Sequence, residues 1–454
     1  MKKLIGWSTT LTLLLVGFAH GQEAPKDLTL SLEDCVKIAL EKSNSVVQGK
    51  LLRDLQDVGV DQAKAAFLPT LSSGWGNSNT INGPRNASFL DESTGTIVQS
   101  VGESTVSGGQ SVNANLNMSL FNASDFANLA AARKNYRAQE LDLTAREHTA
   151  VFLAKRDYYS LLQTMSLLEV QREQVHVSEE SLRRAETLNE IGSSPISQVF
   201  SAKAVLESER ATLILRENAV EIARSQLSFT LGMTPDTRII PIEVEISVDP
   251  VPLSYTKAYE IATRRPALVS DRYQMLGAKD NLRAQRYRQY VPSVRLSGSY
   301  GWNLSDGEDF AGFEDLFLRN YRYTVSVNVS VPILNMGTTT GVKRQKIQYL
   351  QQLETYEQAK RDLGLDVRST LLRLEQLRRT VDANEASVVA QEQDFRLQDE
   401  AYNFGAGTFL DRQQAQLRLF NARSALVRAR YDYQIQIATL EQLIGMPLAE
   451  ALAQ

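Results

Sequence analysis

The sequence has very little of the residue types that cross-link small exported domains or bind metal ions. It contains one cysteine, Cys35, and three histidines in 454 residues. A single cysteine excludes an internal disulfide framework. His148 and His176 have no cysteine or regular set of acidic residues around them, and no HExxH, GxSxG or P-loop pattern occurs. These absences argue against an enzyme and predict neither a cofactor nor a metal site.

Long apolar runs are absent beyond the first residues. Residues 1–21 have the three parts of a secretory signal: Lys2 and Lys3, an apolar stretch over 11–18, and a small-x-small cleavage site at 19–21. That stretch is too short to span a membrane as a helix, and no later run reaches about 18 apolar residues. The sequence therefore predicts an exported protein without transmembrane helices.

An excess of basic residues is also missing. The chain has a net charge of −4, and removal of Lys2 and Lys3 with the signal would bring it to about −6. Nucleic-acid binding calls for a basic surface. We therefore predict no nucleic-acid partner.

The chain repeats its own pattern once. The matching marks, first half before second, are AFLPTLS around Pro69 and QYVPSVR around Pro292, LFN ending at Asn122 and ILN ending at Asn335, Gly192 and Gly405, and LGM ending at Met233 and IGM ending at Met446. The first pair is 223 residues apart and the other three are each 213 apart. Three marks at one offset favour a duplicated chain over chance.

The duplication predicts the domain limits. Residues 22–234 form the first repeat, 235–252 connect the repeats, 253–446 form the second repeat, and 447–454 are a short tail. The offset changes only around 77–111 or 303–321. Since loop tips tolerate insertions, we expect exposed loops there, at the cell surface.

Four segments alternate apolar and polar residues with a period of two, which predicts strands at about 67–77, 111–121, 291–302 and 321–332. About ten residues with one apolar face suit a tilted transmembrane strand. A half-buried sheet of a soluble protein is the alternative. If the strands cross a membrane, their polar residues face a water-filled lumen. The residues expected there are Asn113, Asn115, Asn117, Arg295, Arg322 and Asn328.

The remaining sequence is helical. Residues 122–189 contain neither proline nor glycine, so one helix of about 65 residues, roughly 100 Å long, is expected there, with a counterpart over 336–402. Leu206, Leu213, Val220 and Leu227 recur every seven residues, which indicates knobs-into-holes packing of a returning helix. The two hairpin tips are expected near 189–198 and 402–411. Their turns hold Gly192, Pro195, Gly405 and Gly407.

One copy of the chain cannot make a membrane barrel. A sheet in lipid must close so that every backbone polar group is satisfied. The smallest membrane barrels have about eight strands, and this chain supplies four. Two or three copies would be needed, and the sequence pattern does not decide between them.

In the order of these elements, the chain resembles the TolC-type outer-membrane efflux proteins over essentially its whole mature length. The motifs that carry the resemblance, in chain order, are LSLEDCVKIALEKS at 30–43, AFLPTLS at 66–72, LNEIGSSPIS at 188–197, LGMTP at 231–235, VPSVRLSGSYGW at 291–302 and YNFGAGTFLD at 402–411. No single motif is decisive, but the duplicated order of all of them is quite specific.

The resemblance implies a mixed α/β membrane protein that assembles as a homotrimer. A twelve-stranded transmembrane β-barrel would lie in outer-membrane lipid, and a long α-helical coiled-coil barrel would cross the periplasm. A periplasmic adaptor protein and an inner-membrane transporter would dock at the hairpin tips. The implied function is an exit duct of a tripartite efflux or type I secretion system, gated at its periplasmic end.

The resemblance also names gate residues at the tips. Tyr402 matches the family's tyrosine, and Asp411 matches its first acidic residue, which predicts a ring of carboxylates at the entrance. The second acidic position is Gln414, the expected basic residue is Gly407, and the usual Thr-Asp pair is Ser197-Gln198. These departures predict a gate held by hydrogen bonds and packing rather than by a charged latch.

A periplasmic coiled-coil adaptor or structural protein of an envelope complex is the main alternative, because adaptors also contain helical hairpins. Such a protein would have soluble β-domains flanking one hairpin. Two hairpins and two loop-bearing strand pairs favour the channel. The sequence does not indicate which substrate is exported.

Overall fold

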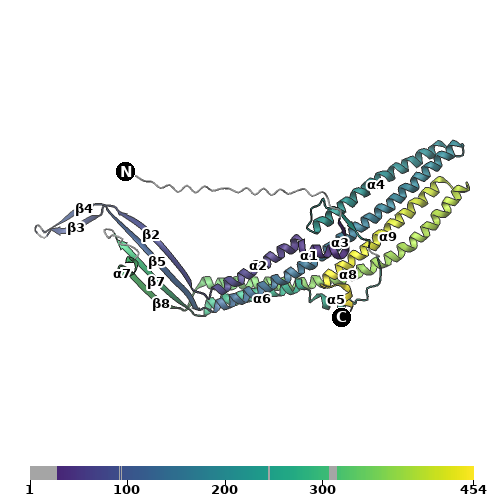
Figure 1. Cartoon of the computed structure of the whole chain (residues 1–454). Helices are drawn as coiled ribbons and strands as arrows, with labels where there is room; N and C mark the ends of the chain where they lie inside the picture. Colours follow the sequence, from purple (N-terminus) through teal and green to yellow (C-terminus); the bar gives the residue numbers. More distant parts are fainter. Residues whose placement is uncertain (1–27, 92, 94, 244–245, 306–313, 454) are drawn as a thin grey trace, which may run out of the picture. The chain divides into compact units, whose positions relative to one another are not determined.

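The structure is a computed structural model that describes residues 28–453 except 92, 94, 244–245 and 306–313 (Figure 1). The expected signal at 1–21 lies outside these residues. The chain divides into two compact units. Unit 1 comprises residues up to 42 with 153–247 and 383–431, and unit 2 comprises 43–152, 248–382 and 432–454.

Two long helices dominate the chain, as the lack of breakers predicts. Helix α3 spans Ala123–Glu190 and α8 spans Met336–Asn403, each of 68 residues. Two shorter helices follow them after tight turns, α4 at Ile196–Thr230 and α9 at Phe409–Ile444. Three of the four predicted heptad positions on α4 are buried, namely Leu206, Val220 and Leu227. The expected helical hairpins are therefore confirmed.

The core of unit 1 lies around the first described strand and the helix that follows it. Strand β1 (Leu28–Leu30) pairs in parallel with β6 (Ile239–Pro241), and α1 (Leu32–Lys42) follows it. Tyr158 lies fully buried in this core and its hydroxyl donates to the carbonyl of Ile242 at 2.6 Å. Cys35 is also fully buried there, and burial raises the pKa of its thiol to about 12.

Unit 2 holds the remaining short helices and their core. These are α2 (Asn44–Ala65), α5 (Tyr255–Ala262), α6 (Pro266–Tyr290) and α10 (Leu448–Ala453). The core includes Leu363, Val367, Tyr433 and Leu440. The hydroxyl of Tyr433 donates to the carbonyl of Asp249, so this buried polar group is satisfied.

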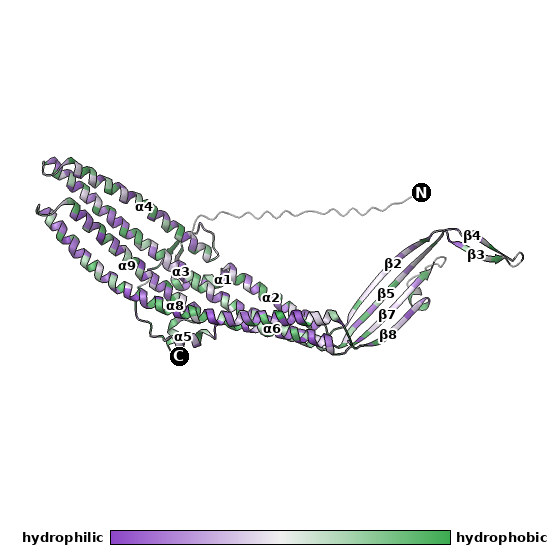
Figure 2. Cartoon of the chain, turned by 180° about the vertical axis from the view of Figure 1, so that it is seen from behind, coloured by the Kyte–Doolittle hydropathy of each residue, from purple (hydrophilic) through white to green (hydrophobic). Residues whose placement is uncertain are grey.

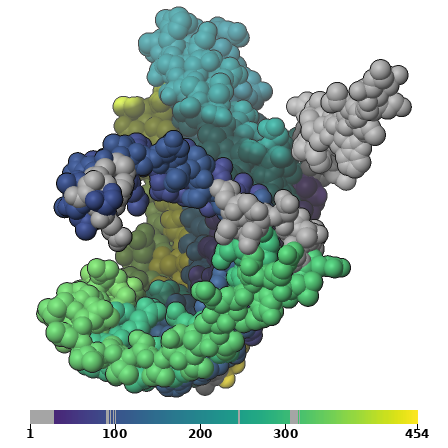
Figure 3. Space-filling model, turned by 90° about the vertical axis from the view of Figure 1, so that its left-hand side faces the viewer, coloured from purple at the N-terminus to yellow at the C-terminus, as the bar shows by residue number. Residues whose placement is uncertain are grey.

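A four-stranded antiparallel sheet also belongs to unit 2. Its strands are β2 (Thr70–Asn82), β5 (Thr105–Phe121), β7 (Ser293–Ser305) and β8 (Tyr321–Ser330), in the order β2-β5-β7-β8. The strand pairs of the two sequence halves thus join through β5 and β7. The sheet does not close: in Figure 3 the blue strands of the first half and the green strands of the second form the two arms of an open curve.

The strands differ from the predicted bounds at several ends. The first begins at Thr70 rather than near 67, because α2 runs to Ala65 and Pro69 follows. The ladder between β2 and β5 continues to the pair Asn82–Thr105, well into the predicted loop. Backbone pairing sustains it through serine, asparagine and glycine, which give no apolar alternation to detect. The last strand ends at Ser330 rather than near 332.

The predicted loops contain further regular structure. Within 77–111, β3 (Asn86–Asp91) and β4 (Thr96–Val101) form a separate antiparallel hairpin. Within 303–321, the described part includes the short helix α7 (Asp315–Leu318). The segments expected to be exposed loops therefore also contain regular secondary structure. Whether they reach the cell surface stays a prediction.

Candidate functional site

The two hairpin tips of unit 1 are built by the same backbone turn. Gly192 has a φ of +75° and Gly405 a φ of +72°. After each helix the next amide bonds back in the same way, Ser193 to the carbonyl of Leu188 and Ala406 to that of Ala401. This is the glycine-ended C-cap that closes many helices, and it needs a left-handed residue at that position. The turn glycines therefore act through backbone conformation.

The other two predicted turn residues lie at the same tips. Pro195 is the N-cap of α4, with a φ of −72°. Gly407 packs against the preceding helix, since a Cβ there would lie 3.1 Å from the backbone nitrogen of Tyr402. A basic side chain at this position, as the family resemblance led us to expect, would need the turn to shift.

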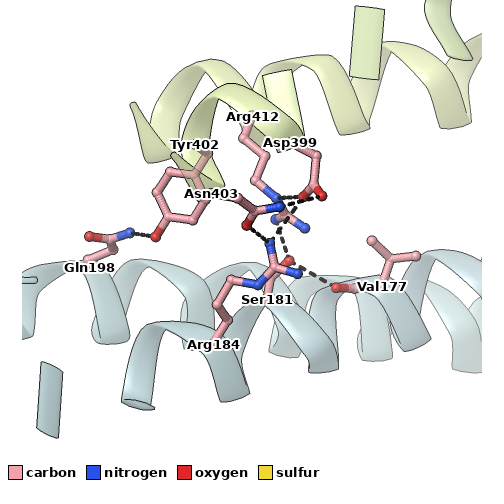
Figure 4. A network of polar contacts seen from close by, with 8 residues as sticks. All are labelled: Val177, Ser181, Arg184, Gln198, Asp399, Tyr402, Asn403 and Arg412. Atoms are coloured by element: carbon pink, nitrogen blue, oxygen red, sulfur yellow. Dashed lines mark hydrogen bonds and ion pairs between the residues drawn. The ribbon is translucent and has the colours of Figure 1, made fainter. Parts of the chain in front are cut away.

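Tyr402 links the two hairpins. The side-chain amide of Gln198 on α4 donates to the hydroxyl of Tyr402 on α8 (Figure 4). The ring of Phe409 meets the Tyr402 ring edge-on, with centroids 6.2 Å apart. Ser197 and Gln414 are exposed, and neither side chain forms a hydrogen bond within the described residues. Among the predicted gate residues, all of which the structure describes, Gln198 and Tyr402 are the two joined by a hydrogen bond.

Asp411 is engaged in a local cap at the start of α9. The hydroxyl of Thr408 donates to its carboxylate at 2.6 Å, and the backbone amide of Asp411 donates back to the Thr408 hydroxyl at 3.2 Å. This reciprocal pair is typical of a helix N-terminus. The alternative of an ordinary helix-start aspartate thus has direct structural support. A ring of Asp411 carboxylates stays a prediction.

A group of charged and polar side chains that sequence analysis did not single out joins the two hairpins. This hairpin ion cluster consists of Ser181, Arg184, Asp399, Asn403 and Arg412 (Figure 4). Arg184 on α3 donates to the carboxylate of Asp399 on α8 at 3.2 Å and to the amide oxygen of Asn403 at 2.7 Å. Arg412 on α9 pairs with the same carboxylate and donates to the hydroxyl of Ser181 on α3 at 2.7 Å. The gate predicted from the motifs, held by hydrogen bonds and packing rather than by a charged latch, stays a prediction, and these ion pairs add charged contacts between the two hairpins.

Arg412 is the most deeply placed member of the cluster. Its side chain is 5% exposed, whereas that of Asp399 is 28% exposed. The guanidinium also lies over the ring of Phe395, 5.7 Å from its centroid. Removing one partner of a buried ion pair leaves an uncompensated charge and costs about 3–5 kcal/mol. Partial exposure of Asp399 puts this pair at the lower end of that range.

The carboxylate of Asp399 feels two opposing effects. Burial alone would raise its pKa, but the hydrogen bond and charge of Arg412, with the charge of Arg184, outweigh burial and hold the pKa below the ordinary value. Asp399 is therefore ionised at neutral pH and accepts from both guanidinium groups. The tips are held together by charge as well as by the Gln198–Tyr402 hydrogen bond.

The predicted lumen residues lie on one face of the sheet. Register pairs Gly74 with Asn113, Asn113 with Gly301 and Gly301 with Arg322, so these side chains share a face. The same face recurs at every second residue along each strand. It carries all six predicted positions, Asn113, Asn115, Asn117, Arg295, Arg322 and Asn328.

The opposite face of the sheet is apolar, and much of it is exposed in the single chain, although Trp302 on this face is buried. Val325 is 78% exposed, Leu71 76% and Trp75 69%. Green and purple alternate along the strands when the chain is coloured by hydropathy (Figure 2). A half-buried sheet of a soluble protein would cover such a face, and among the described residues of unit 2 nothing covers it at Val325, Leu71 or Trp75.

Two kinds of site are absent from the described residues, a membrane-spanning helix and a metal site. None of the helices there is long and apolar enough to cross a membrane. In the same part of the chain, no three histidine, cysteine or acidic side chains gather as a metal site would require.

Known proteins share this architecture and sequence pattern. The family model described as "Outer membrane efflux protein" matches residues 35–233 and again 258–446. The chain belongs to the outer membrane efflux protein family. The outer membrane protein TolC of Vibrio cholerae is 22% identical over 449 residues, which cover 98% of this chain and 96% of that protein.

Solved structures of family channels have the same fold. A crystal structure of CusC superimposes with a TM-score of 0.77 at 19% identity and covers 91% of this chain and 92% of its own. The outer membrane protein VceC from Vibrio cholerae superimposes with a TM-score of 0.75 at 18% identity, covering 92% and 96%. The present member of the outer membrane efflux protein family is thus a channel protein of the outer membrane that extends into the periplasm.

Proposed function

We propose that three copies of this chain form the exit duct of a tripartite efflux or type I secretion system. The observation that carries the proposal is the open four-stranded sheet, which has unpaired edges at β2 and β8, one apolar exposed face and one polar face. In lipid such edges must pair. Three copies supply twelve strands, an even number within the range of bacterial outer-membrane barrels. The polar face would line the lumen.

The proposal includes an internal duplication with the limits predicted from sequence. It is supported by the family model, which matches two stretches of similar length. It is also supported by element order: a helix, two strands of the main sheet, a 68-residue helix and a returning helix occur in each half. An adaptor protein and an inner-membrane transporter would engage the hairpin tips from the periplasmic side.

The proposed gate is the pair of hairpin tips. In each protomer the hairpin ion cluster and the Gln198–Tyr402 hydrogen bond hold the α3–α4 hairpin against the α8–α9 hairpin. Opening would require the second hairpin to move from the first, which breaks the contacts of Arg412 with Ser181 and of Arg184 with Asp399. A partner that docks at the tips could supply the free energy for this step.

Two measurements test the proposal. The mature protein, purified in detergent, should have the mass of a trimer and should fractionate with the outer membrane, whereas an adaptor body would not require detergent. In a planar bilayer it should give a small conductance that rises several-fold in the double variant Arg412→Met/Tyr402→Phe. A monomer or dimer in detergent would contradict the trimer. An unchanged conductance would contradict this gate.

A further inference from the structure

The four strands of the main sheet contain no acidic residue. Across β2, β5, β7 and β8 there is also no lysine, and the charged residues are Arg295 and Arg322. The remaining positions on the polar face are serine, threonine, asparagine and glycine. This distribution contrasts with the whole chain, in which acidic residues outnumber basic ones by 53 to 49.

Both arginines belong to the polar face and are exposed. Arg295 lies opposite Ser119 on β5 and Asn328 on β8, and Arg322 lies opposite Gly301. Within the described residues neither guanidinium forms an ion pair or a hydrogen bond. Their positive charge is therefore not compensated by the sheet that presents them.

The surroundings of each arginine offer room and further polar groups. Beside Arg322 the face is hollowed, with a volume of about 570 Å³ lined in part by Asn113 and Asn115. Near Arg295, the amide of Asn328 donates to the hydroxyls of Ser297 and Ser326 at 3.3 Å each. Such hydroxyl and amide groups can donate to an oxyanion that a guanidinium attracts.

The two arginines mark different heights of the sheet. Arg295 is the third residue of β7, and Arg322 pairs with Gly301, six residues further along that strand. Six residues of strand span about 20 Å. Just after β5, the carboxylate of Asp125 on α3 accepts from the hydroxyl of Ser119 at 3.4 Å.

We propose that the wall of the barrel favours anions, and that Arg295 and Arg322 are the residues that attract them. This inference rests on the proposed trimer with its polar face towards the lumen. Three copies then give two rings of three guanidinium groups, about 20 Å apart, in a wall without carboxylates. A channel lined by one sign of charge concentrates the opposite ion. The class of solute favoured is one with phosphate, carboxylate or sulfonate groups.

Arginine suits this role because it stays charged throughout the physiological range and binds oxyanions through two parallel donors. The preference should therefore not depend on pH between about 5 and 9. It should weaken as ionic strength rises, since salt screens charges that face water.

The test uses purified trimers in a planar bilayer, with tripolyphosphate as the anionic probe added to each side in turn. Native channels should be blocked, and the half-blocking concentration should rise at least tenfold in Arg295→Gln/Arg322→Gln. The variant Ser78→Asn, on the same face of β2 but outside the hollow beside Arg322, changes no charge and should be blocked as the native channel is. Reversal potentials in a KCl gradient should shift towards cation preference in the double variant only.

The outcomes separate this inference from the proposed function. Absence of any channel would count against the trimeric duct itself. Channels that form normally but show the same block and reversal potential in the double variant would overturn the anion preference alone. If the double variant does not assemble, the single variants Arg295→Gln and Arg322→Gln decide, since each removes one ring and should weaken block by at least threefold.

Discussion

The hairpin tips and the sheet use charge in opposite ways. At the tips, Arg184 and Arg412 both pair with the carboxylate of Asp399, and Arg412 is almost fully buried. On the sheet, Arg295 and Arg322 are exposed and unpaired within the described residues. A paired, buried charge can stabilise one arrangement of helices, whereas an unpaired charge stays available to solutes. The charged residues at the tips therefore stabilise the packing of the two hairpins, whereas the arginines on the sheet can bind solutes.

The largest effect is expected from a charge placed on the wrong face of the sheet. Val327→Lys should cost about 2–4 kcal/mol at a lipid-facing midplane position. Its neighbour Asn328 lies on the polar face, so Asn328→Lys should be tolerated. The measurement is the amount of heat-resistant trimer in outer-membrane fractions. Equal losses in both variants would favour a soluble sheet over a membrane barrel.

At the tips, removal of the buried guanidinium should come next. Arg412→Met is expected to cost about 3 kcal/mol because Asp399 loses its closest partner. The control is Arg418→Met, which removes a pair with Asp394 whose side chains are 47% and 36% exposed. Such a surface pair contributes about 0–1 kcal/mol. The unfolding temperature should fall and the basal conductance should rise in Arg412→Met only. Similar changes in both variants would show that the hairpin ion cluster does not hold the hairpins together.

A backbone test separates the turn from the charges. Gly405→Ala forces a left-handed conformation on alanine and should destabilise the tip by about 1–2 kcal/mol. The same change at Gly59, which lies inside α2 with open space around it, should be neutral or stabilise by up to about 1 kcal/mol. Opposite signs in thermal unfolding are the expected result. A stabilised Gly405→Ala variant would contradict the turn described for this hairpin.

A smaller effect is expected at Asp411. Loss of the cap with Thr408 in Asp411→Ala should cost about 1 kcal/mol of helix stability. If three Asp411 carboxylates also ring the entrance, block by divalent or trivalent cations added from the periplasmic side should weaken in the same variant. Reduced stability with unchanged cation block would leave Asp411 a cap and remove it from the entrance.

The last prediction concerns the response of the tips to acid, which depends on Asp399 and should be absent near neutral pH. Its pKa is held below the ordinary value of 3.8, so the stability that it contributes is fully present above pH 3.8 and is lost as pH falls through the lower pKa of the folded tip. Basal conductance should therefore rise only in strong acid. Asp399→Asn should remove this acid response, and an acid response that persists in that variant would assign it to another group.

Sequence pattern predicted the main elements well where the physics is local. The run without glycine or proline over α3, the heptads of α4 and the alternation on β8 each follow from a period that a single segment displays. The long ends of β2 and β5 were missed because their many serine, asparagine and glycine residues pair through backbone groups. The β3–β4 hairpin was missed because its apolar residues stand next to each other, as Phe89 and Leu90 do and as Ile97 and Val98 do, and do not alternate with polar ones. No side-chain period reports such pairing.

The candidate site was predicted less completely. The turn glycines, Tyr402 and Gln198 were named from motifs near each tip, but the hydrogen bond between Tyr402 and Gln198 was not predicted. Arg184 and Asp399 are 215 residues apart in sequence and meet only because two hairpins pack together. On a helix such charges resemble any solvated face. Only packing of α3 against α8 and α9 distinguishes them, and a motif search at the turns cannot detect it.

The buried position of Cys35 makes this chain convenient for probe chemistry. Thiol reagents attack the thiolate, and a fully buried thiol with a pKa near 12 presents almost none. A cysteine introduced at an exposed site, such as Ser197→Cys at the tip or Asn328→Cys on the sheet, would thus be the sole reactive thiol of the native background. Spin labels or fluorophores could then report tip movement and lumen access without first replacing Cys35.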